Sequence, residues 1–138
     1  MSFMDSTLES HKSKQKVIGP KVHGMIDYAH VAFFFTVALL CRKNNKPAAV
    51  AALCTGSFVL AQSLLTDYPL GVKPLIPFEV HGKMDVAFAS ASWVIPKVFR
   101  FSGTKAAKIF ETNSAVEGTV AGMTDFSSQR AHDERLGE

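Results

Sequence analysis

The sequence predicts an all-α protein: an antiparallel four-helix bundle made of two tandem helical hairpins, which we expect to be transmembrane. Three observations support this prediction. They are an internal repeat, long apolar segments rich in Ala and Leu, and breaks that contain Pro and Gly. Apolar runs of this length and composition favour helices over strands.

The internal repeat is visible in two short phrases. His-Gly-Met-Ile-Asp at residues 23–27 returns 58 residues later as His-Gly-Lys-Met-Asp at 81–85. At the same offset, Thr-Asp-Tyr at 66–68 returns as Thr-Asp-Phe at 124–126. The two units that contain these phrases align without a gap and share 11 identities in 53 pairs, against roughly three or four expected from average residue usage. The sequence therefore indicates a tandem duplication.

The repeat divides the chain into one domain with a polar segment at each end. Residues 1–15 are rich in Ser and Lys and lack apolar periodicity, so we expect a flexible polar arm. Residues 127–138 are expected to be a polar tail in solvent. The single domain, 16–126, consists of repeat 1 at 16–68, a linker at 69–73 and repeat 2 at 74–126.

Repeat 1 predicts two helices. Pro20 begins a first helix that ends near Cys41, and Pro47, at a favoured first-turn position for proline, begins a second that ends near Asp67. Residues 68–74 contain two prolines and a glycine, which cannot continue a helix.

Repeat 2 follows the same plan. A third helix is expected from Phe78 or Glu79 toward Phe99, and Pro96 is expected to kink or end it. After a turn at 102–104, a fourth helix should begin at Lys105 and end at Asp125.

Hydropathy favours a membrane protein, although unevenly. The chain has 47% apolar and 20% charged residues and a mean hydropathy of +0.13. Residues 47–66 carry no formal charge over a length that matches a bilayer, whereas the third and fourth helices carry several charges. A soluble bundle therefore stays open as an alternative. Small residues spaced four apart, which allow close helix packing in lipid, are Ala48, Ala52 and Gly56, and Ser114, Gly118 and Gly122.

These patterns lead to an expected location and expected partners. We predict a multi-pass protein of the cell inner membrane with both termini cytoplasmic, in contact with the lipid bilayer and with a homo-oligomer or a larger membrane complex. The net charge of +3 is modest and the lysines are scattered, so nucleic-acid binding has little support. Cys41 and Cys54 stand alone, which argues against a disulfide framework.

The order of the repeated phrases resembles the SPW-repeat family of small bacterial membrane proteins. The phrases are His-Gly-x-Ile-Asp-Tyr at 23–28, Leu-Leu-Thr-Asp-Tyr at 64–68 and Ile-Pro-x-x-x-His at 76–81. The Ser-Pro-Trp motif of that family corresponds to Ala-Ser-Trp at 91–93. The resemblance implies that each repeat is a two-helix transmembrane hairpin, and it implies no particular activity.

The polar residues shared by the two repeats are the candidate site. In an antiparallel hairpin the start of the first helix lies beside the end of the second, so we expect the shared His and Asp residues to meet at one end of the bundle. His30 lies on the same helix face as His23 and Asp27, at a spacing of i, i+4 and i+7. The candidates are His23, Asp27, His30, Asp67, His81, Asp85 and Asp125.

Three roles are open for this set. The first is structural: Asp67 and Asp125 lie near helix C-termini, where the dipole disfavours negative charge, so a neighbouring helix start would have to hold them. The second is a divalent metal ion, or a haem with one axial His from each repeat. The third is proton or solute handling.

No Gly-rich phosphate loop or nucleophile elbow indicates an enzyme. We therefore expect an integral membrane protein that is a structural or accessory subunit without a required cofactor, with the metal- or haem-binding bundle as the alternative.

Overall fold

The computed structural model describes residues 16–138, which form five α-helices. The prediction of an all-α fold is confirmed: residues 16–138 contain no strand and only two isolated β-bridges. The flexible arm predicted for residues 1–15 lies outside the described residues.

The first two helices form an antiparallel hairpin. Helix α2 (Pro20–Cys41) has a proline in its first turn, as predicted, and α3 (Lys46–Leu64) begins where the Asn45 side chain accepts a hydrogen bond from the Ala48 amide at 3.2 Å. Helix α3 ends before the predicted Asp67. Residues 65–67 leave the helix because their backbone bonds to the segment that precedes the next helix.

The next two helices form a second antiparallel hairpin, made of α4 (Phe78–Val98) and α5 (Lys105–Met123). Thr104 caps α5 by accepting a hydrogen bond from the Ala107 amide at 3.2 Å. Pro96 lies inside α4 and the helix continues to Val98, so the proline does not end it. A proline this close to a helix end interrupts little of the remaining hydrogen bonding.

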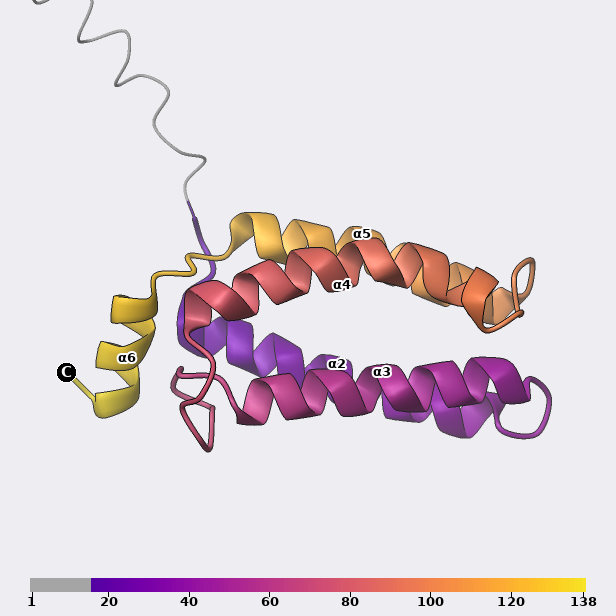
Figure 1. Cartoon of the computed structure of the whole chain (residues 1–138), viewed down its shortest axis with the longest axis horizontal. Helices are drawn as coiled ribbons and strands as arrows, with labels where there is room; N and C mark the ends of the chain where they lie inside the picture. The colour runs from indigo at the N-terminus through magenta and orange to yellow at the C-terminus, as the bar shows by residue number, and fades with distance from the viewer. Residues whose placement is uncertain (1–15) are drawn as a thin grey trace, which may run out of the picture.

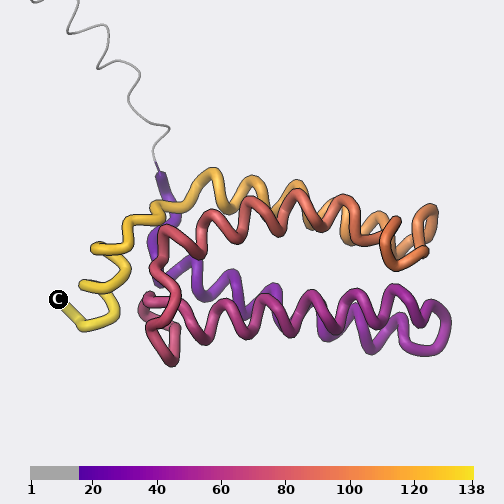
Figure 2. Tube along the Cα trace, in the orientation of Figure 1, coloured from indigo at the N-terminus to yellow at the C-terminus, as the bar shows by residue number. Residues whose placement is uncertain are grey.

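The two hairpins lie one over the other, with both turns at one end of the molecule (Figures 1 and 2). Near the turns an apolar cluster joins them: the Phe34 ring of α2 and the Phe101 ring before α5 each lie 5.3 Å from the Phe110 ring of α5. The alanines of this cluster, Ala48, Ala51, Ala52, Ala106 and Ala107, come from the starts of α3 and α5.

At the opposite end the backbone links one hairpin to the other. The Asp67 amide donates to the Ile76 carbonyl at 2.9 Å, and the Asp125 amide donates to the Ile18 carbonyl at 2.9 Å. The residues after α3 are thereby attached to the segment before α4, and the residues after α5 to the segment before α2. These links join the two hairpins to each other.

A fifth helix, α6 (Ser128–Leu136), lies in the segment expected to be a polar tail in solvent. Ser127 caps it by accepting from the Arg130 amide at 3.2 Å, and Ala131 is buried against Tyr68 and Phe78. Helix α6 therefore covers the linked end of the molecule (Figure 1). The sequence expectation missed this helix because a single buried alanine produces no apolar stripe.

Polarity is distributed unusually over α2–α5. Two helices, α2 and α3, are long and apolar enough to cross a membrane. Large apolar side chains point outward on all four helices, with Leu40 74% and Trp93 56% exposed. The buried residues include many polar ones: His23, Asp27, Thr55, Gln62, Ser63, Thr66, His81, Asp85, Ser92, Asn113, Glu117 and Thr124.

Candidate functional site

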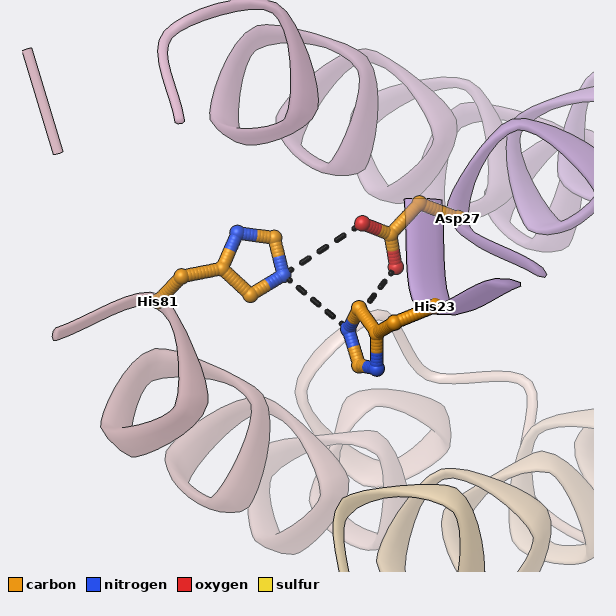
Figure 3. A group of neighbouring side chains, drawn as sticks. All are labelled: His23, Asp27 and His81. Atoms are coloured by element: carbon orange, nitrogen blue, oxygen red, sulfur yellow. Dashed lines mark hydrogen bonds and ion pairs between the residues drawn. The ribbon is translucent and has the colours of Figure 1, made fainter. Parts of the chain in front are cut away.

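Four of the seven candidate residues meet at the linked end. His23 and Asp27 lie one turn apart on α2, and His81 and Asp85 lie one turn apart on α4. The two His rings point toward each other with Asp27 beside them (Figure 3). All four side chains are buried, and each imidazole residue is only 1% exposed. We call these four residues the His/Asp cluster.

Closely similar distances separate the imidazole nitrogens and carboxylate oxygens at the centre of the cluster. The Nε2 atoms of His23 and His81 are 3.3 Å apart. Asp85 Oδ2 lies 3.1 Å from the first of them and 3.3 Å from the second. Asp27 spans the same pair, with Oδ1 3.3 Å from His23 Nε2 and Oδ2 3.4 Å from His81 Nε2. Both carboxylates therefore face both imidazoles.

Two threonines orient the imidazoles. Thr124 Oγ1 lies 2.9 Å from His23 Nδ1, and Thr66 Oγ1 lies 2.7 Å from His81 Nδ1. Each threonine hydroxyl donates its hydrogen to the carbonyl four residues earlier, at 2.7 Å. The hydroxyl oxygens must therefore accept from the imidazoles, so both Nδ1 atoms carry hydrogen.

This assignment has a consequence for the centre of the cluster. When Nδ1 carries the hydrogen of a neutral imidazole, Nε2 presents a lone pair. Two such lone pairs then face the oxygens of two carboxylates at 3.1–3.4 Å. Acceptors at this spacing repel one another, so the centre requires positive charge, supplied by protons or by a metal ion.

Each carboxylate is held by a further donor. The Tyr68 hydroxyl donates to Asp27 Oδ2 at 2.9 Å, and the Gln62 amide donates to Asp85 Oδ1 at 2.8 Å. Burial, followed by the negative charge of Asp27, raises the pKa of the Tyr68 hydroxyl. Tyr68 therefore remains a neutral donor to Asp27.

The glycines that follow the two histidines allow close packing of rings. A Cβ on Gly24 would lie 3.0 Å from the Tyr68 ring, and one on Gly82 would lie 2.6 Å from the Phe126 ring. Only a glycine permits such an approach of ring and helix. The repeated His-Gly dipeptide thus places one aromatic ring against each hairpin start.

Asp67 and Asp125 lie outside the cluster, although the sequence predicts them within it. Asp67 Oδ2 is 2.9 Å from His132 Nδ1, and Asp125 Oδ2 is 3.0 Å from the Arg130 guanidinium, both on α6. The predicted capping of α2 and α4 by these aspartates is not seen within residues 16–138: neither helix begins with a side-chain cap, and the Glu79 amide of α4 donates to Ser128 Oγ. Their role is to attach α6.

His30 also lies outside the cluster, because it is two turns farther along α2 than His23. Its Nε2 lies 2.9 Å from Asn113 Oδ1 and 3.4 Å from Glu117 Oε1, both on α5. The helix face predicted to hold three ligands therefore serves two separate polar groups.

The candidate set predicted from the sequence leaves out five residues that orient or neighbour the site, which are Gln62, Thr66, Tyr68, Glu117 and Thr124. The threonines at 66 and 124 were inside the repeated phrase Thr-Asp, so the repeat itself marked them. Gln62 and Glu117 have no counterpart in the other unit, where Val120 and Val59 stand. Glu117 belongs to a polar stripe on the fourth predicted helix, together with Asn113 and Thr124, which could have marked it, whereas no sequence signal marks Gln62.

The chemistry of the cluster suits a cation. His23, Asp27 and His81 alone offer three ligand atoms that lie within 4.8 Å of one another. Imidazole with carboxylate suits zinc, iron or manganese. Comparison of this chain with family models, with curated proteins and with solved structures finds no match.

Proposed function

We propose that this chain is a small integral membrane protein in which a divalent metal ion, bound by His23, Asp27, His81 and Asp85, joins two tandem hairpin repeats. The ion has a structural role, and the protein acts as an accessory subunit rather than as an enzyme. The observation that carries the proposal is the geometry of the cluster, in which oriented acceptor atoms surround one point.

The distances support a small tetrahedral ion. Ligand atoms around zinc, at bond lengths of about 2.0–2.1 Å, lie about 3.3–3.4 Å apart. His23 Nε2, His81 Nε2 and Asp85 Oδ2 form a triangle with sides of 3.3, 3.1 and 3.3 Å. This triangle has the edge lengths of one face of such a tetrahedron, and Asp27 lies beside both histidines, with Oδ1 3.3 Å from His23 Nε2 and Oδ2 3.4 Å from His81 Nε2.

The surroundings of the cluster also support a metal centre. Metal-binding histidines usually donate their other ring N–H to a fixed acceptor, and metal-binding carboxylates are themselves hydrogen-bonded. Thr66 and Thr124 meet the first condition, and Tyr68 and Gln62 meet the second.

The donor set favours a bare ion with a structural role. Binding of one ion by all four side chains would leave no open position for a substrate, which is typical of structural rather than catalytic zinc. A haem would place its ring between two axial histidines. Nε2 atoms 3.3 Å apart, with carboxylates on both, leave no room for that ring.

The surface supports membrane residence for all four long helices. The outward-facing residues of α2–α5 include Leu39, Leu40, Val50, Leu53, Val86, Trp93, Val94 and Val116. Polar side chains inside and apolar side chains outside are the arrangement that a bilayer favours. The charged residues of α4 and α5 are buried at Asp85 and Glu117, or lie within two turns of a helix end.

Four spans would place both termini on one side of the membrane, which we propose is the cytoplasmic side because the N-terminal arm is basic. We also propose membership of the SPW-repeat group, supported by the order of the His-Gly and Thr-Asp phrases.

The metal is tested on the full chain extracted from membranes with detergent and purified without chelators. Elemental analysis should find about one zinc, manganese or iron ion per chain. Replacing zinc by Co²⁺ should produce the strong visible absorption of a tetrahedral site. His23→Asn should lose the ion, whereas His30→Asn, on the same helix but outside the cluster, should keep it.

The overturning result is a purified protein without metal that also fails to bind added zinc or cobalt. The cluster would then be joined by shared protons, which is the metal-free structural alternative. Membrane residence is tested separately by lysis without detergent, after which the chain should sediment with the membranes. A chain found in the soluble fraction would refute it.

A further inference from the structure

Helix α6 covers the end of the molecule at which the His/Asp cluster lies (Figures 1 and 2). Between this helix and the imidazoles stands one layer of aromatic side chains. Tyr68 and Phe78 are fully buried, and on one side they pack against Ala131 of α6. On the other side the Phe78 ring lies 5.4 Å from the His23 ring and 5.7 Å from the His81 ring. Removal of α6 would therefore expose to water the side chains that cover the imidazoles.

The other sides of the cluster are closed to a hydrated ion. Along the hairpins many large apolar side chains point outward, and in the membrane location proposed above they face lipid. At the turn end the buried rings of Phe34, Phe101 and Phe110 pack together between the hairpins. A divalent ion that crossed either region would lose its water without gaining ligands, which is costly. The end under α6 is the remaining way between water and the cluster.

Helix α6 is held by few and weak contacts. Ala131 is its one buried residue. Its polar contacts with the hairpins include an ion pair of Arg130 with Asp125 at 3.0 Å and a contact of His132 Nδ1 with Asp67 at 2.9 Å, and the side chains from α6 are about half exposed in both. Exposed pairs of this kind contribute little stability. An element with so little buried surface opens locally far more often than the whole protein unfolds.

The ligands of the cluster do not depend on α6 for their positions. The threonines that orient the imidazoles, Thr66 and Thr124, bond to the carbonyls of their own helices at 2.7 Å. The segments after α3 and α5 are held by the backbone bonds between the hairpins. Among residues 16–138, no cluster residue and no side chain that donates to or orients the cluster bonds to α6. Undocking of α6 would therefore open the cluster without dismantling it.

We propose that α6 is a lid that controls exchange of the divalent ion between water and the His/Asp cluster. With α6 docked the ion is enclosed, and with α6 undocked it enters or leaves past Tyr68 and Phe78. The inference deepens the proposed function and rests on the metal centre and the membrane location given there. Because the lid does not bind the ion, it changes the rates of uptake and release by the same factor and leaves the affinity unchanged.

The test follows Co²⁺ exchange in the full chain reconstituted in lipid nanodiscs. Uptake is measured by the visible absorption of bound Co²⁺, and release by loss of that absorption in excess EDTA. The variant Ala131→Gln places a long polar side chain where Ala131 is fully buried. Both rates should rise about tenfold or more, because an unpaired amide buried under α6 shifts docking by at least that factor. The Kd should not change.

Two controls match the variants that loosen the lid. Leu136→Gln installs the same residue at an exposed position of α6 and should leave both rates unchanged. Asp125→Asn removes the ion pair with Arg130 and should raise both rates about 1.5- to 5-fold. Lys83→Gln removes an exposed ion pair on α4 instead and should change neither rate. Hydrogen exchange of the α6 amides, measured by mass spectrometry, shows how far the helix has undocked in each variant.

Two results would overturn the lid. One is undocking of α6 without faster exchange of Co²⁺, and the other is faster release with an equal loss of affinity, which would make α6 part of the metal site. Elemental analysis of the same samples separates the lid from the metal centre. A chain that holds its ion and exchanges it equally fast in all variants refutes only the lid, whereas a chain that binds no ion refutes both.

Discussion

The two hairpins match at one end of the molecule and differ in the middle. At the linked end His23 and His81, Thr124 and Thr66, and Gly24 and Gly82 make equivalent contacts. Halfway along, His30 and Asn113 on one side correspond to Phe88 and Thr55 on the other. The His/Asp cluster joins two equivalent units and must satisfy both of them with the same atoms, whereas the side chains halfway along each hairpin face their own surroundings and can vary alone.

The largest expected effect tests whether His23 and His81 contribute equally to the stability of the His/Asp cluster. His23→Asn and His81→Asn should each lower the free energy of unfolding by about 3–5 kcal/mol, because each leaves two buried carboxylates without one of their two imidazole partners. Thermal unfolding in detergent, followed by circular dichroism, measures this. A neutral result for one variant beside a large loss for the other would break the equivalence.

The next effect concerns the donors to the two carboxylates, which differ between the two halves of the cluster. Tyr68 donates to Asp27, but Phe126 stands at the corresponding position and Gln62 holds Asp85. Tyr68→Phe should cost about 1.5–3 kcal/mol, the value of a hydrogen bond to a charged group.

The control for this change is Tyr28→Phe. Tyr28 donates to the Leu70 carbonyl at 2.8 Å, outside the cluster. Loss of that neutral bond should cost only about 0.5–1.5 kcal/mol. Equal losses in the two variants would show that Tyr68 contributes nothing specific to the cluster.

A smaller effect is expected for the threonines that orient the imidazoles. Thr66→Val and Thr124→Val remove the acceptor of a buried imidazole N–H, so each should cost about 1–3 kcal/mol and weaken metal binding about 10–100-fold. Thr119→Val is the control, since the Thr119 hydroxyl is exposed and bonds only to its own helix. Stability losses that differ strongly between Thr66→Val and Thr124→Val would show that the two halves of the cluster are not equivalent.

The smallest effect compares the glycines of α3 and α5. A Cβ on Gly56 would lie 2.8 Å from the Phe35 ring, whereas nothing lies within 4 Å of a Cβ on Gly118. Gly56→Ala should therefore destabilise the protein by overpacking, and Gly118→Ala should stabilise it by about 0.5–1 kcal/mol through helix propensity. Shifts of the unfolding midpoint in opposite directions would show that Gly56 of α3 serves close packing and Gly118 of α5 does not.

Much of the fold followed from local patterns in the sequence. The prolines at 20 and 47, the break at 68–74 and the long apolar runs indicated four helices close to their observed bounds. The shared His-Gly-x-x-Asp phrase holds the four polar side chains that come together, but the predicted set also included Asp67, Asp125 and His30, which do not join them. Helix α6 escaped prediction because its packing rests on one alanine and on ion pairs to Asp67 and Asp125.

The sequence by itself determined the helices and the pairing of positions 58 residues apart, because helix periodicity and an internal repeat are both visible in the order of the residues. Only the tertiary structure decided what those positions contact. It turned Asp67 and Asp125 toward α6, moved His30 to Asn113 and Glu117, and bonded each imidazole to the threonine of the other hairpin. Contacts between hairpins depend on how helices far apart in the chain pack against each other, which local patterns do not encode.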